Sequence, residues 1–184
     1  MHRWHERPGP PLCGGGRKKG DPQEPQDHGL GRSRGGYTTK VHLVGESNGW
    51  ALAATISPGQ RHEIRCFEVT MNAVKIPQPV GRPRTRPDRL AGDMGYNAGW
   101  IRDWCKRRKI TDVIPRPESQ QRPDQVFDKS TYRRRNIIER LIGWLKECRA
   151  VFTRYDKLAV NYLAMVKLAI VQRYLRILDS PDRP

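Results

Sequence analysis

The sequence predicts an α/β (α+β) fold in which a mixed sheet with a β-hairpin is followed by long C-terminal helices. Two apolar and β-branched runs, 38–44 and 50–56, flank Asn48-Gly49, and this pattern is typical of a hairpin. The order strand, helix, strand over 89–115 is typical of a parallel pair joined by a crossover. Apolar residues then recur at helical spacing through most of 131–178.

Composition and charge narrow the class of protein. The chain has 184 residues, enough for one ordinary domain, and a formal net charge of +16. Such an excess of Lys and Arg favours a polyanionic partner, with nucleic acid ahead of an anionic membrane, although a basic protein can simply be soluble. No apolar run approaches the ~20 residues of a membrane span, and residues 1–6 do not resemble a secretory signal. Four widely spaced cysteines without a C-x-x-C pair argue against a zinc or disulfide framework and favour the cytoplasm.

In the N-terminal half, predicted strands and helices alternate with segments rich in Gly and Pro. Residues 1–36 are rich in Gly, Pro and charge, which predicts a disordered basic arm. The hairpin comes next, and 62–74 has the spacing of a helix. A loop over 77–87 then alternates Arg with Pro or Thr. Its cations could follow a phosphate backbone or only keep the loop soluble; they are Arg82, Arg84 and Arg86.

The second half supplies the crossover and the helices. A strand over 89–92 leads into Asp93, a helix follows over 98–108, and a second strand covers 112–115. In the helix, Trp100 and Trp104 stand at i and i+4, which favours a core position over a base-stacking platform. A polar loop precedes two long helices, at 131–150 and about 155–178, and a short tail ends the chain at 179–184.

The helix predicted over 131–150 has a polar line opposite its apolar stripe. At ~100° per residue, a sector of about 60° contains Tyr132, Arg135, Glu139 and Lys146. Most such lines are only the solvated face of an amphipathic helix. The alternative is a carboxylate between cations, able to hold a metal ion while the cations hold phosphates.

The spacing Y-x-x-R-x-x-x-E-x-x-x-x-x-x-K in this helix resembles the last catalytic helix of DDE transposases of bacterial insertion sequences, particularly the insertion-sequence-five-like group. Four further segments resemble that family in the same order, at 29–40, 58–63, 91–96 and 153–162. The resemblance covers about 17–178. It implies that 37–178 is the C-terminal part of an RNase H-like catalytic domain.

The resemblance implies particular roles. Asp93 takes the place of the second metal-binding acid and Glu139 that of the third, although an Asp at this position can also cap a helix. The cofactor implied is Mg²⁺ or Mn²⁺, for which carboxylate oxygens are suitable ligands. The implied partner is DNA, both the ends of the element and its target, in a homo-oligomeric complex within the nucleoid. The DNA-binding residues of this helix would be Tyr132, Arg135 and Lys146. From the charge of their loop, and not from the resemblance, Arg82, Arg84 and Arg86 are added as candidates for phosphate contact.

The family's first acid should precede the hairpin on a strand of its own. The acids before Tyr37 are Glu6, Asp21, Glu24 and Asp27, and none stands in an apolar run. We therefore expect an incomplete fold without its first strand, in a truncated and catalytically defective transposase; the alternative is a non-catalytic DNA-binding remnant or regulator of transposition. Codons permitted for residues 1–10, shifted by one nucleotide, can encode an Asp and then Val-Arg-Ala-His, so residues 1 to about 15 are predicted to be out of frame.

Overall fold

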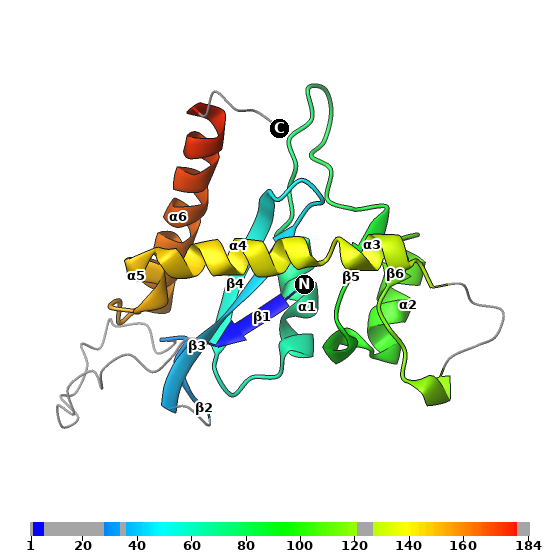
Figure 1. Ribbon diagram of the computed structural model, residues 1–184, viewed down its shortest axis with the longest axis horizontal. Helices are drawn as coiled ribbons and strands as arrows, with labels where there is room; N and C mark the ends of the chain where they lie inside the picture. The colour runs from blue at the N-terminus through cyan, green and yellow to red at the C-terminus, as the bar shows by residue number, and fades with distance from the viewer. Residues whose placement is uncertain (1, 6–27, 34–35, 121–126, 180–184) are drawn as a thin grey trace. The chain divides into compact units, whose positions relative to one another are not determined.

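The structure is a computed structural model that describes residues 2–5, 28–33, 36–120 and 127–179 (Figure 1). It is a mixed α/β fold in two compact units. Of the described residues, the first unit contains 2–3, 42–55, 62–120 and 127–142. The second contains 4–5, 28–33, 36–41, 56–61 and 143–179. The chain passes from one unit to the other within three strands, one loop and one helix.

The predicted hairpin is confirmed as β3 (Gly36–Gly45) and β4 (Ala51–Pro58). Its turn is closed by the amide of Glu46, which donates to the carbonyl of Trp50 at 2.9 Å. Gly49 has φ +88°, a conformation that glycine adopts without strain. Every residue from 38 to 44 is buried, so β3 is covered on both faces although its sequence alternates.

Two strands lie within 1–36, where the sequence predicts no regular element. They are β1 (His2–His5) and β2 (Gly31–Ser33), and the sheet order is β1-β3-β2 with β4 also paired to β3. β2 is antiparallel to β3, with Gly31 opposite Thr38. The expectation that no strand precedes the hairpin is therefore wrong. A sheet ladder consists of main-chain groups, so strands this short can pair with a long buried strand without an apolar run of their own.

The predicted crossover is confirmed in the first unit. β5 (Arg89–Ala91) and β6 (Thr111–Val113) are parallel, with Leu90 opposite Asp112, and α2 (Gly99–Arg107) connects them. The two strands form a sheet separate from the four-stranded one. The sequence predicted a single mixed sheet, but the described residues form two. The short strands β5 and β6 make their main-chain hydrogen bonds with each other and not with the four-stranded sheet.

Aromatic rings build the core of the first unit. The helix predicted over 62–74 is a 3₁₀ turn, η1 (Glu63–Cys66), followed by α1 (Phe67–Asn72). Phe67 is buried, and its ring centroid lies 5.1 Å from that of Trp104 in an edge-to-face contact. Trp104 is a core residue as predicted, whereas Trp100 also packs on Phe67 but remains 43% exposed.

The helix predicted over 131–150 is broken into three pieces. They are α3 (Lys129–Arg133), α4 (Asn136–Glu147) and α5 (Arg149–Phe152). Between α3 and α4 the amides of Arg135, Ile137 and Ile138 each donate to the carbonyl three residues earlier, as in a 3₁₀ turn. Successive arginines at 133–135 repel one another, and Asn136 is a residue type favoured at helix starts, so the sequence offers a break here.

In the second unit, Arg154 joins the strands to the last helix. α6 (Ala159–Asp179) is the second long helix predicted, and its Tyr162 is fully buried with its hydroxyl donating to Val151 O at 2.9 Å. The guanidinium of Arg154 donates to Thr39 Oγ1 in β3 and to Lys157 O. It also lies 4.9 Å from the Tyr162 ring centroid. None of the described helices is long and apolar enough to cross a membrane.

Candidate functional site

Asp93 lies in the turn that follows β5, at the position before η2 (Met94–Tyr96). Its side chain makes no capping hydrogen bond, so the structure does not support the N-cap interpretation. The atom Oδ1 is buried and has no hydrogen-bond partner among the described residues. A Cβ placed on Gly95 would lie 3.0 Å from this oxygen, so the glycine keeps the approach to the carboxylate open. A buried acceptor without a donor is costly, which makes Asp93 a strong candidate to bind a ligand.

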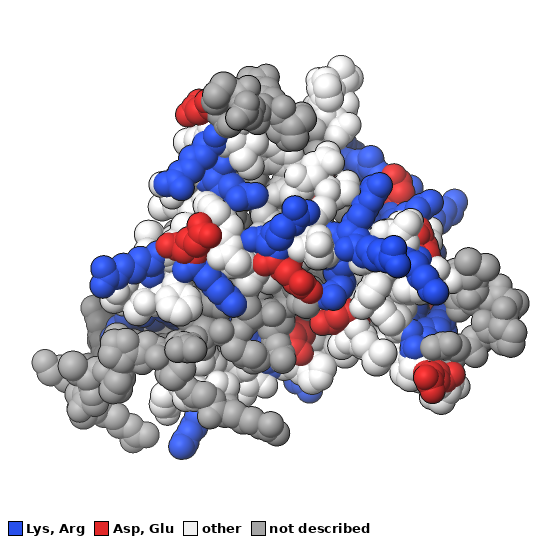
Figure 2. Space-filling model, viewed as in Figure 1, with Lys and Arg blue, Asp and Glu red and all other residues white. Residues whose placement is uncertain are grey.

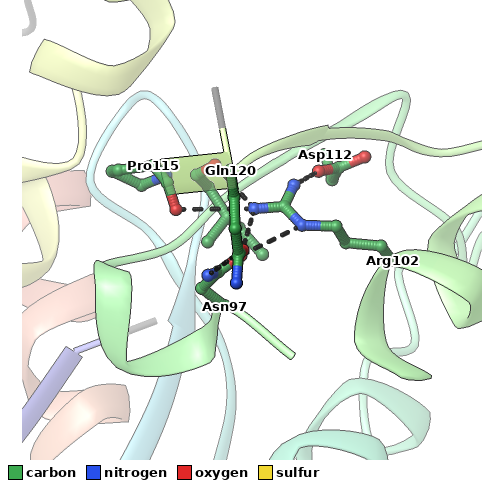
Figure 3. Close-up of polar contacts among 6 residues, drawn as sticks. Asn97, Arg102, Asp112, Pro115 and Gln120 are labelled. Atoms are coloured by element: carbon green, nitrogen blue, oxygen red, sulfur yellow. Dashed lines mark hydrogen bonds and ion pairs between the residues drawn. The ribbon is translucent and has the colours of Figure 1, made fainter. Parts of the chain in front are cut away.

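Arg102 holds this turn in place from α2 (Figure 3). Its Nη2 donates to Asn97 Oδ1 at 2.7 Å and to Ile114 O at 3.0 Å. Its Nη1 pairs with Asp112 Oδ2 in β6. Asn97 follows directly on η2 and donates in turn to Gln120 Oε1, in η3 (Glu118–Gln120), at 3.0 Å.

The environment of Arg102 shows that it has a positioning role. Burial lowers the pKa of the guanidinium, and the neighbouring Asp112 carboxylate opposes that shift. One half-buried side chain thereby joins the turn after β5 to the end of β6, the two strand ends of the crossover. Sequence reasoning missed this residue, because its partners stand 5 to 13 positions away and only the fold brings them together.

The residues predicted to form one line on one helix are divided by the break between α3 and α4. Tyr132 ends up on α3, Arg135 in the break and Glu139 on α4. They nevertheless meet: the Arg135 guanidinium lies 5.2 Å from the Tyr132 ring centroid and 3.2 Å from Glu139 Oε1. Glu139 and Lys146 share α4, so the predicted line of four residues is interrupted only between Tyr132 and Glu139.

A cap that the sequence reasoning missed joins α3 to β5. Asp128 accepts a hydrogen bond from the amide of Thr131 at 2.9 Å and one from the Ser130 hydroxyl at 2.7 Å. Hydrogen bonds from Thr131 hold the pKa of the Asp128 carboxyl below its ordinary range. Arg89 of β5 pairs with the same carboxylate at 2.8 Å. The strand that leads to Asp93 is therefore tied to the helix that carries Tyr132.

A pocket of about 520 Å³ opens in the first unit between the hairpin turn, α1, the 77–87 loop, β5 and the α3–α4 break. Its apolar floor includes Leu52 and Met71. Two acids, Glu46 and Asp88, and five cations line its walls; the cations are Arg84, Arg86, Arg89, Arg134 and Arg135. This arrangement can hold an anionic group such as a phosphate. Neither Asp93 nor Glu139 lines the pocket, but Glu139 pairs with Arg135 of its wall at 3.2 Å.

The donor set suits a hard cation. Asp93 offers a buried carboxylate oxygen, and Glu139 offers a carboxylate already held by Arg135 at 3.2 Å. Mg²⁺ is commonly bound by one or two carboxylates and completes its shell with water. In the part of the chain that the structure describes, no group of three or more His, Cys, Asp or Glu gathers as a metal site. Asp93 and Glu139 thus supply carboxylate oxygens of the kind that Mg²⁺ and Mn²⁺ prefer.

Comparison with known proteins identifies the family. A family model for the transposase DDE domain matches residues 6–172, most of the chain. No curated protein and no solved structure matches it. The match spans the crossover that presents Asp93, the pocket walls and the broken helix that carries Glu139. The chain therefore belongs to the transposase DDE domain family.

Proposed function

We propose that this protein is an insertion-sequence transposase of the insertion-sequence-five-like group in which Asp93 and Glu139 are the second and third metal-binding acids. The observation that carries the proposal is the buried Oδ1 of Asp93, which has no hydrogen-bond partner among the described residues. A buried carboxylate oxygen that accepts no hydrogen bond is stabilised when a cation binds it. Its place at the end of a parallel strand agrees with the second acid of the family.

The cation of this site is Mg²⁺ or Mn²⁺, held by the carboxylates of Asp93 and Glu139. When bound, such cations activate water or a DNA 3′-hydroxyl and stabilise the oxygen that leaves the phosphodiester. Arg135 pairs with the Glu139 carboxylate at 3.2 Å and orients it. Arg102 fixes the turn of Asp93 by its bonds to Asn97 and to the end of β6.

The substrate is DNA, both the ends of the element and the target. A net charge of +16 supplies attraction for the phosphate backbone, and Lys and Arg side chains spread over the face in Figure 2. Around the pocket we assign phosphate contacts to Arg84, Arg86 and Arg135. Tyr132 stacks beneath Arg135 and keeps its guanidinium in place. Lys146 adds a further phosphate contact, and the active assembly on DNA is a homo-oligomer.

We also propose that the protein is catalytically defective because the first acid is missing. The strand β1 precedes the hairpin and pairs with β3, but residues 2–5 are His, Arg, Trp and His, and none has a carboxylate. Of the earlier acids, Glu6, Asp21, Glu24 and Asp27 lie outside the described residues. Two carboxylates hold two cations poorly, since a cation without its full ligand set loses geometry and affinity. Sequencing the gene tests whether a shifted frame encodes an Asp here.

Two measurements on the full chain separate these claims. Calorimetry with Mn²⁺ should show weak binding that Asp93→Asn abolishes and Glu139→Gln weakens. Asp103→Asn, which changes an exposed acid of α2, is the matched control and should change nothing. Equal heats for all three variants would overturn the metal assignment. In a plasmid-nicking assay with Mn²⁺ we expect no cleavage; cleavage that is lost in Glu139→Gln would overturn the defect while supporting the acids.

A second candidate function is a DNA-binding regulator of transposition. The charge that favours DNA does not depend on an intact metal site, so binding can outlast catalysis. Affinity for unrelated duplexes should fall steeply between low and moderate salt. If affinity does not respond to salt, phosphate contacts do not drive binding and both functions lose their partner.

A further inference from the structure

The loop between α1 and β5 is a projecting hairpin. Two main-chain hydrogen bonds close it: the amide of Ile76 donates to Arg84 O at 2.9 Å, and the amide of Arg84 donates to Ile76 O at 2.8 Å. In Figure 1 this segment extends away from α1, β5 and α2 of its own unit. Every residue from 77 to 86 is exposed, and Val80 at the tip is 91% exposed. An exposed apolar residue at the end of a projection is unusual unless something covers it.

The tip has a fixed conformation. Prolines at 77, 79 and 83 restrict φ around it, and Gly81 has φ +94°, where other residues are strained. A Cβ built on Gly81 meets nothing within 4 Å, so space is not the reason for the glycine. The glycine sets the turn and leaves the main chain bare on its outer side. A rigid tip loses little entropy when it binds.

The three arginines of the loop differ in their contacts. Arg84 pairs with Asp88 at 2.8 Å and donates to Arg86 O at 3.0 Å. Arg86 donates to Arg108 O at 3.0 Å, at the end of α2. Among the described residues, Arg82 makes no hydrogen bond or ion pair, and it is exposed. Arg84 and Arg86 therefore stabilise the stem beside the pocket that they line, whereas Arg82 at the tip lies outside that pocket.

We propose that the tip of this hairpin, Val80 to Arg82, inserts into the minor groove of duplex DNA. The inference rests on the proposed function for the identity of the partner. The minor groove is only about 6 Å wide, which suits a bare glycine flanked by extended chain. Its negative potential attracts an arginine, and apolar side chains enter it as wedges against base steps. A contact to phosphate alone would leave the exposed Val80 without a use.

The groove can be identified by base substitution. Three duplexes of equal length and charge carry tracts of A·T, G·C or I·C pairs, in which inosine replaces guanine. An I·C pair lacks the minor-groove amino group of guanine but keeps the major-groove pattern of G·C. We expect the full chain to bind the A·T and I·C duplexes at least about fivefold more tightly than the G·C duplex. This is the smallest difference in affinity that one base-edge contact usually produces between a right and a wrong base pair.

The variant Arg82→Ala should remove this preference and leave the thermal midpoint unchanged, because the side chain is exposed and makes no hydrogen bond or ion pair with the described residues. Arg107→Ala removes one exposed charge of α2 and is the matched control. It should weaken binding to all three duplexes equally and keep the preference. Val80→Ser should reduce the preference, since it removes only the apolar contact.

Each contrary result has a separate meaning. Equal affinity of the unsubstituted chain for the three duplexes would overturn the proposal in favour of phosphate contact alone. An I·C duplex that binds like G·C would place the tip in the major groove, against the proposal. If Arg82→Ala and Arg107→Ala keep the same preference, the hairpin is not the reader. In these cases the protein still binds DNA, so the proposed function stands. If the protein binds none of the three duplexes, DNA is not its partner and the proposed function fails.

Discussion

Replacing Arg102 by Met should destabilise the first unit by about 3 kcal/mol. The side chain of Arg102 is only 13% exposed and that of Asp112 only 22%. Without the guanidinium, the carbonyl of buried Ile114 loses its donor, which costs about 1–2 kcal/mol. The Asp112 carboxylate loses its counter-charge and regains water in part, which costs a further 1–2 kcal/mol, roughly. Asn97 lies nearer to solvent and adds little.

Urea unfolding followed by tryptophan fluorescence measures this change in free energy. In a separate thermal unfolding experiment, the midpoint should fall by about 6–12 °C for a chain of this size. The double variant Arg102→Met/Asp112→Asn should recover roughly 1 kcal/mol, because a neutral amide needs no counter-charge. The same single variant should weaken Mn²⁺ binding, since the turn of Asp93 loses its tie to β6. A loss below about 1 kcal/mol would refute the reasoning, for it would mean that water replaces the guanidinium at every acceptor.

Three further outcomes follow from the contacts described. The lowered pKa of Asp128 means that its stabilising effect is present above the ordinary value of 3.8 and is lost as pH falls through the folded value; the difference in unfolding free energy between the protein and Asp128→Asn should therefore shrink in acid titrations. Burial raises the pKa of Cys105 to about 11 from 9.0, so stability should hold below pH 9 and decline as pH rises through about 11; a Cys105→Ala variant that declines equally would contradict this. Arg154→Lys should lower the unfolding free energy by roughly 2 kcal/mol, because lysine lacks the planar fork that reaches Thr39 and Lys157 together; an unchanged urea midpoint would disprove the need for that fork.

Local patterns predicted the elements whose partners are close in sequence. The hairpin could be predicted because Asn48-Gly49 favours a tight turn and the flanking runs are apolar. The crossover could be predicted because strand, helix and strand follow one another within 89–115. The strand β1 could not be predicted, since its pairing with β3 depends on main-chain groups and leaves no apolar pattern.

The candidate site divides in the same way. Asp93 and Glu139 were named from motif spacing, but their surroundings were not predictable. The orphaned oxygen of Asp93 and the fork of Arg102 arise from contacts between elements, which composition and periodicity do not encode. Helical periodicity at 131–150 also concealed the break at Arg134, because a 3₁₀ turn changes the hydrogen-bond pattern over only a few residues.

The break between α3 and α4 also affects how the signature tolerates changes of length. In a continuous helix, one inserted residue would rotate everything beyond it by ~100° and turn Glu139 away from Tyr132. Here the turn at 134–135 can absorb an extra residue by changing its own conformation, as loops do. Asp128 and Arg89 would still fix α3 to β5, and Ile138 and Leu141 would still fix α4 in the core. Relatives that differ in length at this point should therefore retain the acid on its helix, so alignments of the signature need a permitted gap there.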